Sequence, residues 1–282
     1  ARAQGGRRGM EAGGARAGGR AGGGKAAPGA AGDVEQGLGA GAGGLDPELG
    51  ELFGGGPAGA FREAEVRRGF VRKVFGIVAF QLLVSSVVAV GMSAIPPLKA
   101  YVASPRGAWT LWTGLGVTLA LVLTLSCSPD LARRHPHGLI LLSAFTAAEG
   151  WVIGAVTMFA DTQIVISAAL ITVVVVAALT LFAFQTKYDF TMKRGLIFTV
   201  LLGLILFGLG AMFFRSKVVT IAWSAAGAAV FSAILVVDVQ LLMSGKRYSL
   251  SEDDYILAAL AIYLDVVNIF MHILRLLQAS QR

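Results

Sequence analysis

Seven apolar runs, each long enough to cross a lipid bilayer, dominate the sequence after residue 60. A helix crosses a hydrocarbon core about 30 Å thick with roughly 20 residues, and it satisfies its own backbone hydrogen bonds where lipid cannot. The predicted spans are Val74–Ile95, Trp109–Cys127, Gly138–Phe159, Ile164–Phe184, Gly195–Phe214, Val218–Met243 and Tyr255–Leu277. The sequence therefore predicts an all-α membrane protein, a seven-transmembrane helix bundle over residues 61–282 with no separate soluble domain.

Residues 1–60 have a different composition. They hold 22 of the 37 glycines and few large apolar side chains. Such a segment cannot bury enough apolar surface to offset the entropy lost on ordering. We expect residues 1–60 to be a disordered Gly/Ala-rich tail.

The basic residues predict an orientation in the membrane. Outside the tail, twelve Lys and Arg residues flank the spans on the side of the N-terminus, against five on the other side. Because basic loops stay in the cytosol, the N-terminus is predicted to be cytosolic. The net charge of +7 comes from these loops, so it indicates membrane orientation and not nucleic-acid binding. The last span is the least hydrophobic, which leaves open whether it crosses fully.

Three acids lie inside predicted spans: Glu149, Asp238 and Asp265. A charged side chain at this depth costs at least ~2.5–3.5 kcal/mol, so it marks a functional site unless it only bridges two helices. Spacing alone leaves a contact between Asp238 and Asp265 open. Gly150 and Gly154 directly follow Glu149, and such a pair of small residues lets another helix approach closely.

The last span carries a polar stripe. Asp265, Asn268, His272 and Arg275 fall on one face at helical periodicity. That face is expected to look into the bundle or a wet cavity, away from lipid. For His272, a neutral histidine bonded to a neighbour is favoured over a metal ligand.

Several classes of membrane enzyme and receptor do not fit these residues. Asp238 and Asp265 lack the GxGD motif of membrane aspartyl proteases, and His272 is the one histidine within a predicted span. A zinc hydrolase needs clustered ligands, and a retinal protein needs a lysine in its last helix. We therefore expect no enzyme activity and no cofactor.

The C-terminal block "DVQLLMSGKRYSLSEDDYILAALAIYLDVVNIFMHILRLL" resembles the signature of the transmembrane Bax inhibitor motif family, in particular its Lifeguard branch. The blocks "VRRGFVRKVFGIVAFQLLVSS", "FTAAEGWVIG" and "FAFQTKYDFT" are similar to the same branch. The resemblance covers about Arg67 to Leu277. It implies a seven-helix bundle with the last helix central, a Ca²⁺ leak from the endoplasmic reticulum or Golgi, and suppression of cell death.

The resemblance also implies a pair of aspartates that share a proton and sense pH, and the matching positions are Asp238 and Asp265. Where family members usually have an aromatic residue and a threonine around the first aspartate, this chain has Val237 and Val239. Ca²⁺ takes carboxylate oxygens as ligands, so the ionised pair would hold the ion transiently, with Glu149 as supporting polar lining.

These observations leave two functions open. The first is a pH-regulated Ca²⁺ leak channel or exchanger, with Ca²⁺, protons and membrane lipid as partners and Asn268, His272 and Arg275 as further lining. The second is an interaction protein that binds cell-death or stress regulators and conducts no ions. In that case, the acids within the membrane would only hold the bundle together.

Overall fold

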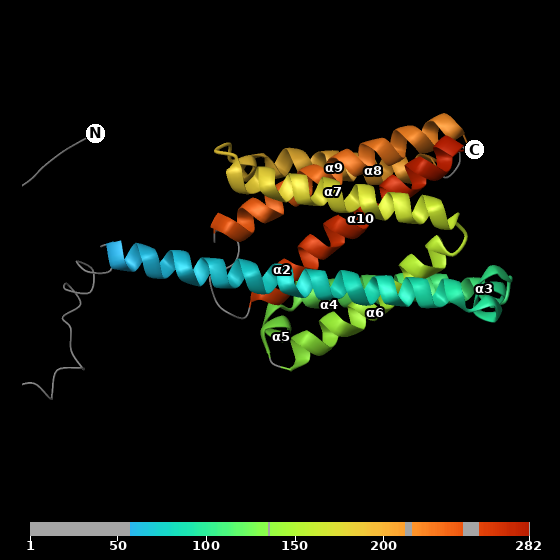
Figure 1. Cartoon of the computed structure of the whole chain (residues 1–282), viewed down its shortest axis with the longest axis horizontal. Coiled ribbons are helices and arrows are strands. Elements are labelled where there is room, and N and C mark those ends of the chain that lie inside the picture. The colour runs from blue at the N-terminus through green and yellow to red at the C-terminus, as the bar shows by residue number, and fades with distance from the viewer. Residues whose placement is uncertain (1–56, 135, 212–215, 245–253, 282) are drawn as a thin grey trace, which may run out of the picture. The chain divides into compact units, whose positions relative to one another are not determined.

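The computed structural model describes residues 57–134, 136–211, 216–244 and 254–281, which form helices joined by short connections and contain no strand (Figure 1). The helices are α2 (Pro57–Ala94), α3 (Pro96–Ala103), α4 (Ala108–Cys127), α5 (Pro129–Arg133), α6 (His137–Thr157), α7 (Thr162–Gln185), the 3-10 helix η1 (Phe190–Lys193), α8 (Arg194–Ala211), α9 (Lys217–Ser244) and α10 (Tyr255–Gln281). Seven of them are long and apolar enough to cross a membrane, which confirms the predicted fold class.

The predicted spans match helices α4, α6, α7, α8, α9 and α10 to within about four residues at each end. Helix α2 is the exception, because it begins at Pro57, well before the predicted start at Val74. Hydropathy detects only the segment within lipid, and a polar stretch can continue the same helix outside it. Residues 57–60, which the sequence assigned to the tail, are therefore helical. The predicted disorder of residues 1–56 lies outside the described residues.

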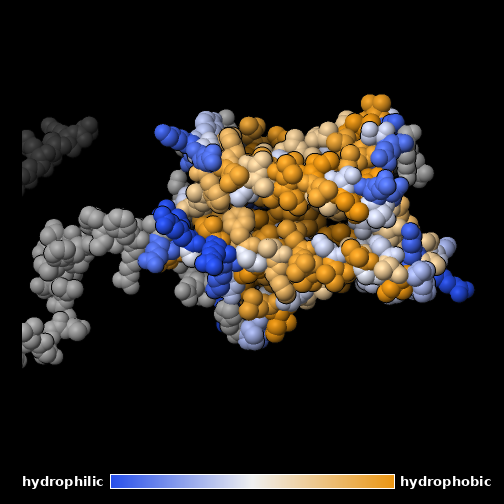
Figure 2. Space-filling model, viewed as in Figure 1, coloured by the Kyte–Doolittle hydropathy of each residue, from blue (hydrophilic) through white to orange (hydrophobic). Residues whose placement is uncertain are grey.

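The outer surface of the bundle is apolar. Large side chains such as Phe80, Trp112 and Phe198 are 64%, 70% and 66% exposed. Figure 2 shows hydrophobic side chains across the middle of one face and hydrophilic ones gathered at its two ends. Contiguous apolar surface on this scale marks contact with a membrane or partner, and seven of the helices are long enough to cross a bilayer. The protein is a multi-pass integral membrane protein.

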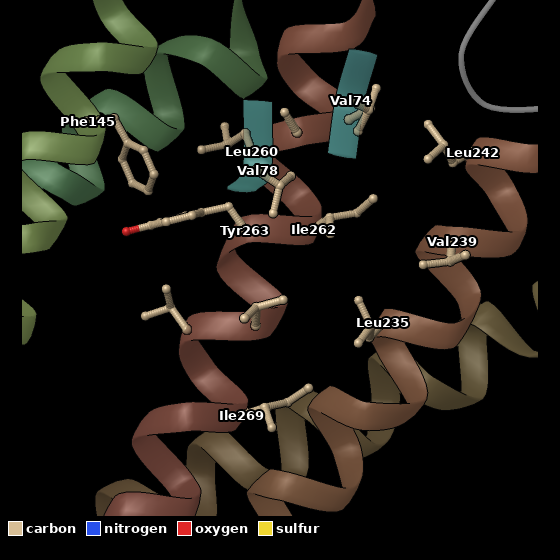
Figure 3. Close-up of a cluster of buried hydrophobic side chains, with 14 of the residues drawn as sticks. Val74, Val78, Phe145, Leu235, Val239, Leu242, Leu260, Ile262, Tyr263 and Ile269 are labelled. Carbon is tan, nitrogen blue, oxygen red and sulfur yellow. The ribbon is translucent and has the colours of Figure 1, made fainter. Parts of the chain in front are cut away.

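Helix α10 is the most buried of the seven. Two thirds (67%) of its most apolar window lies inside the bundle, against 6% for α8. It packs against α2, α5, α6, α7 and α9. Figure 3 shows Tyr263 of α10 directed toward Phe145 of α6, while Leu235 and Val239 of α9 lie on the other side of α10. The two rings meet edge to face with centroids 5.7 Å apart.

Small residues bring α6 and α2 together. A Cβ added to Gly150 would lie 3.2 Å from the Cα of Ser85, and one added to Gly154 would lie 3.1 Å from the Cα of Ala89. Both glycines therefore allow the backbone of α2 to approach closely, as the spacing of small residues predicted. The helix that comes close to the Glu149 segment is α2.

Two contacts fix the start of α10. The ammonium of Lys73 lies 3.7 Å from the centre of the Tyr255 ring. The Arg133 guanidinium donates from Nε to Asp254 Oδ1 at 2.9 Å. Both contacts hold the first turn of α10 beside the early part of α2 and beside α5. Since α10 has 27 residues, about 40 Å of helix, it is long enough to cross the membrane completely.

Candidate functional site

Asp238 and Asp265 are both buried inside the membrane-spanning bundle. They are 8% and 4% exposed, on α9 and α10. The residues flanking Asp238, Val237 and Val239, are themselves buried, and Val239 belongs to the apolar cluster of Figure 3. An ionised carboxylate is costly in such surroundings unless it finds a proton, a cation or hydrogen-bond donors.

The packing of α9 on α10 is set by one close contact. A Cβ built on Gly227 would overlap the ring of His272, so α9 lies against this ring through a residue without a side chain. The same ring is flanked by Trp223 and Phe231, one turn before and after Gly227, with centroids 4.9 Å and 5.7 Å away. Arg275 lies over Trp223 at 5.1 Å, so α10 runs antiparallel to α9 here.

This register places the two aspartates on facing stripes. Asp238 comes eleven residues after Gly227, about three turns, and Asp265 comes seven residues before His272, about two turns. Both therefore lie on the faces that meet at the Gly227–His272 contact. Along the helix axes, Asp238 lies about 16 Å from Gly227 and Asp265 about 10 Å from His272, in the same direction. The two aspartates therefore differ in depth by about 6 Å, one helical turn. Carboxylates on facing stripes of two packed helices are the arrangement that proton sharing or cation binding between them requires.

The rest of the polar stripe also faces the bundle. His272 is 4% exposed, and its Nδ1 has no hydrogen-bond partner among the described residues. The expected bond from His272 to a neighbour is therefore absent at this atom, and the ring is instead held by aromatic packing. The Asn268 amide donates from Nδ2 to the carbonyl of Leu264 in the same helix at 2.8 Å.

Glu149 lies in a different place from the aspartates. It lies on α6 one turn after Phe145, whose ring packs against Tyr263, and Tyr263 precedes Asp265 by two residues. Two residues correspond to about 200° around a helix, so Tyr263 and Asp265 lie on opposite sides of α10. Asp238 and Asp265 thus lie on the meeting faces of α9 and α10, whereas Glu149 lies on α6, beside the Tyr263 side of α10. The described residues contain no group of three or more His, Cys, Asp or Glu side chains that could hold a metal ion.

The sequence model of a family described as "Inhibitor of apoptosis-promoting Bax1" matches residues 67–282. The chain belongs to the Bax inhibitor family. The match includes both aspartates and all seven membrane helices.

Relatives within the Bax inhibitor family carry the name lifeguard. The chain is 33% identical to Protein lifeguard 3 of Homo sapiens over 250 residues, which is 86% of this chain and 78% of the relative. It is 34% identical to Protein lifeguard 3 of Mus musculus, covering 77% of this chain and 71% of the relative. It is 32% identical to Protein LIFEGUARD 4 of Arabidopsis thaliana, covering 77% and 87%.

A second polar cluster in this Bax inhibitor family member escaped the sequence analysis. The hydroxyls of Ser85 and Tyr263 lie 2.6 Å apart, which links α2 to α10. Nearby, Gln81 donates from Nε2 to Thr146 Oγ1 at 2.9 Å, which links α2 to α6. The signal available in the sequence was the pair Gln81 and Ser85, two polar residues one turn apart within an apolar span.

The Ser85–Tyr263 bond predicts a modest effect on stability. Replacing Tyr263 with phenylalanine should lower the free energy of unfolding by about 0.5–1.5 kcal/mol, because one buried hydrogen bond is lost. Ser85→Ala should cost a similar amount, and the double variant should cost less than the sum of the two. Thermal unfolding of the four proteins in detergent measures this coupling. Strictly additive losses would show that the two hydroxyls do not act together.

Proposed function

We propose that the protein is a pH-regulated Ca²⁺ leak channel or exchanger of internal membranes that suppresses cell death. One observation carries the proposal: Asp238 and Asp265 are both buried, on α9 and α10, and the Gly227–His272 contact supports a register in which they lie on facing stripes about one turn apart. Two close carboxylates cannot both ionise cheaply in low dielectric, so one proton shared between them keeps the pair compact. When the proton leaves, the carboxylates repel each other or recruit a cation.

Ca²⁺ is the cation that suits this site. It prefers oxygen ligands and accepts carboxylates in flexible geometry. Two carboxylates are too few ligands for a tight resident site, and weak binding is what a transported ion requires. Suppression of cell death is supported by the description of the family whose model matches the chain. A cytosolic N-terminus follows from the basic bias of the loops, and the endoplasmic reticulum or Golgi from the family resemblance.

Ca²⁺ flux into proteoliposomes containing the full chain tests this function. We expect flux to rise between about pH 5 and pH 8, by up to about tenfold per pH unit, the limit set by release of one proton. Protein-free liposomes are the control. Absence of flux at every pH in this range would refute the channel.

A second function has some support, because the family description names a protein, Bax1, as what is inhibited. In this alternative, the chain binds a cell-death regulator and conducts no ions. Deletion of residues 1–56, which leaves α2 whole, separates the two functions. If cell protection is lost while flux is intact, the interaction is the protective activity; if both persist, the membrane bundle alone is sufficient.

A further inference from the structure

A groove between α2 and α6 lies away from the aspartates. Its volume is about 570 Å³. One end is basic, with Arg72 and Lys73, and its walls are apolar. No acidic side chain is found among the described residues that line it.

The basic end lies at the edge of the apolar part of α2. Arg72 and Lys73 are exposed and directly precede Val74, where the apolar run begins. Basic residues at this position sit at the level of lipid headgroups. The ammonium of Lys73 over the Tyr255 ring holds this side chain at the mouth of the groove.

The walls continue inward over the depth of one leaflet. On α2 they include Ile77, Phe80 and Val84, and on α6 Leu139 and Leu142. From Lys73 to Val84 is about 16 Å along the axis, roughly half of a hydrocarbon core of about 30 Å. Gly76 leaves space in the groove, since nothing lies within 4 Å of a Cβ added there.

We propose that this groove binds one anionic phospholipid, with its phosphate on Arg72 and Lys73 and an acyl chain along the apolar walls. Charge complementarity identifies the headgroup, because two cations and no acid attract an anion. The same charges repel Ca²⁺, so the groove is not the entrance of a cation path. At the deep end, the Gln81 amide donates to Thr146 Oγ1, and this hydroxyl donates to the Leu142 carbonyl at 2.8 Å, so the Thr146 hydroxyl hydrogen is already used. This site is independent of the proposed ion function.

The full chain, delipidated in detergent, provides the test. Native mass spectrometry with added phosphatidylserine or phosphatidylcholine should show one tightly bound phosphatidylserine and weaker phosphatidylcholine. Each basic residue near an anionic lipid surface contributes about fivefold to the affinity. The R72Q/K73Q variant, which loses two, should therefore bind phosphatidylserine about 30-fold more weakly. Arg67→Gln removes an exposed charge of the same helix that does not line the groove, and it should bind as the wild type does.

A substitution that fills the groove tests the contribution of its shape to lipid binding separately from that of its charges. Gly76→Leu should weaken the binding of both lipids while all charges remain. Gly203→Leu on α8 is the matched control, because nothing lies within 4 Å of a Cβ added there either. The proposal is overturned if R72Q/K73Q binds phosphatidylserine as the wild type does, if Arg67→Gln loses as much affinity, or if Gly76→Leu and Gly203→Leu behave alike.

Discussion

Replacing Gly227 with leucine is expected to force α9 away from α10 and to lower the unfolding temperature by about 5 °C or more. A Cβ at this position already overlaps the His272 ring, and that ring is enclosed by Trp223 and Phe231. Since both rings pack on His272, moving its ring aside would break these contacts, and leaving it in place would force the backbones apart. Thermal unfolding in detergent measures the loss.

Two further variants make the Gly227 prediction specific. Gly203→Leu makes the same substitution in open space on α8 and should leave the unfolding temperature nearly unchanged. His272→Ala in the Gly227→Leu background removes the ring and should restore part of the stability. If Gly227→Leu is no worse than Gly203→Leu, the contact does not set the spacing of α9 and α10.

Asp265→Asn is expected to flatten the pH dependence of Ca²⁺ flux or to move its midpoint to lower pH by about one unit or more. The substitution keeps size and hydrogen-bonding capacity but leaves Asp238 without a like-charged neighbour. Asp238→Asn should have the mirror effect, because the two residues are proposed to titrate as one pair. The double variant should resemble either single variant, since coupled groups are not additive.

Glu149→Gln is the matched control for the aspartate pair. It also removes a carboxylate from within the membrane, but on the opposite side of α10 from Asp265. We expect it to keep the midpoint of the flux profile. If both single Asp variants keep the wild-type profile, the shared proton is not the switch, and the two acids serve only to hold α9 and α10 together.

The sequence predicted the membrane spans well because lipid imposes a composition on them. Residues within the hydrocarbon core are apolar unless a function offsets the cost of burying a polar group. Length and hydropathy therefore locate seven helices. The start of α2 was missed because its first turns lie outside that constraint. The same cost of burial singled out Asp238 and Asp265.

The relations between helices could not be predicted in the same way. The depth of Asp238 relative to Asp265 depends on the contact of Gly227 with His272. A glycine in an apolar run does not indicate which residue of another helix packs against it. The sequence predicted Glu149 as supporting polar lining of the aspartate pair. Its placement on the Tyr263 side of α10 depends on the rotation of α6 and α10 about their axes, which neither spacing nor composition determines.

The most buried helix, α10, follows in the chain all the helices that enclose it. During synthesis, the helices from α2 to α9 therefore enter the membrane before the element on which α2, α6, α7 and α9 pack. Until α10 is inserted, the face of α9 that carries Asp238 is not covered by α10. The hydroxyl of Ser85 also has no Tyr263 hydroxyl with which to form a hydrogen bond. A premature stop codon just before residue 255 would therefore leave six membrane helices without the most buried one. Polar groups that α10 normally covers would then be exposed to lipid and accessible to the membrane quality control of the cell.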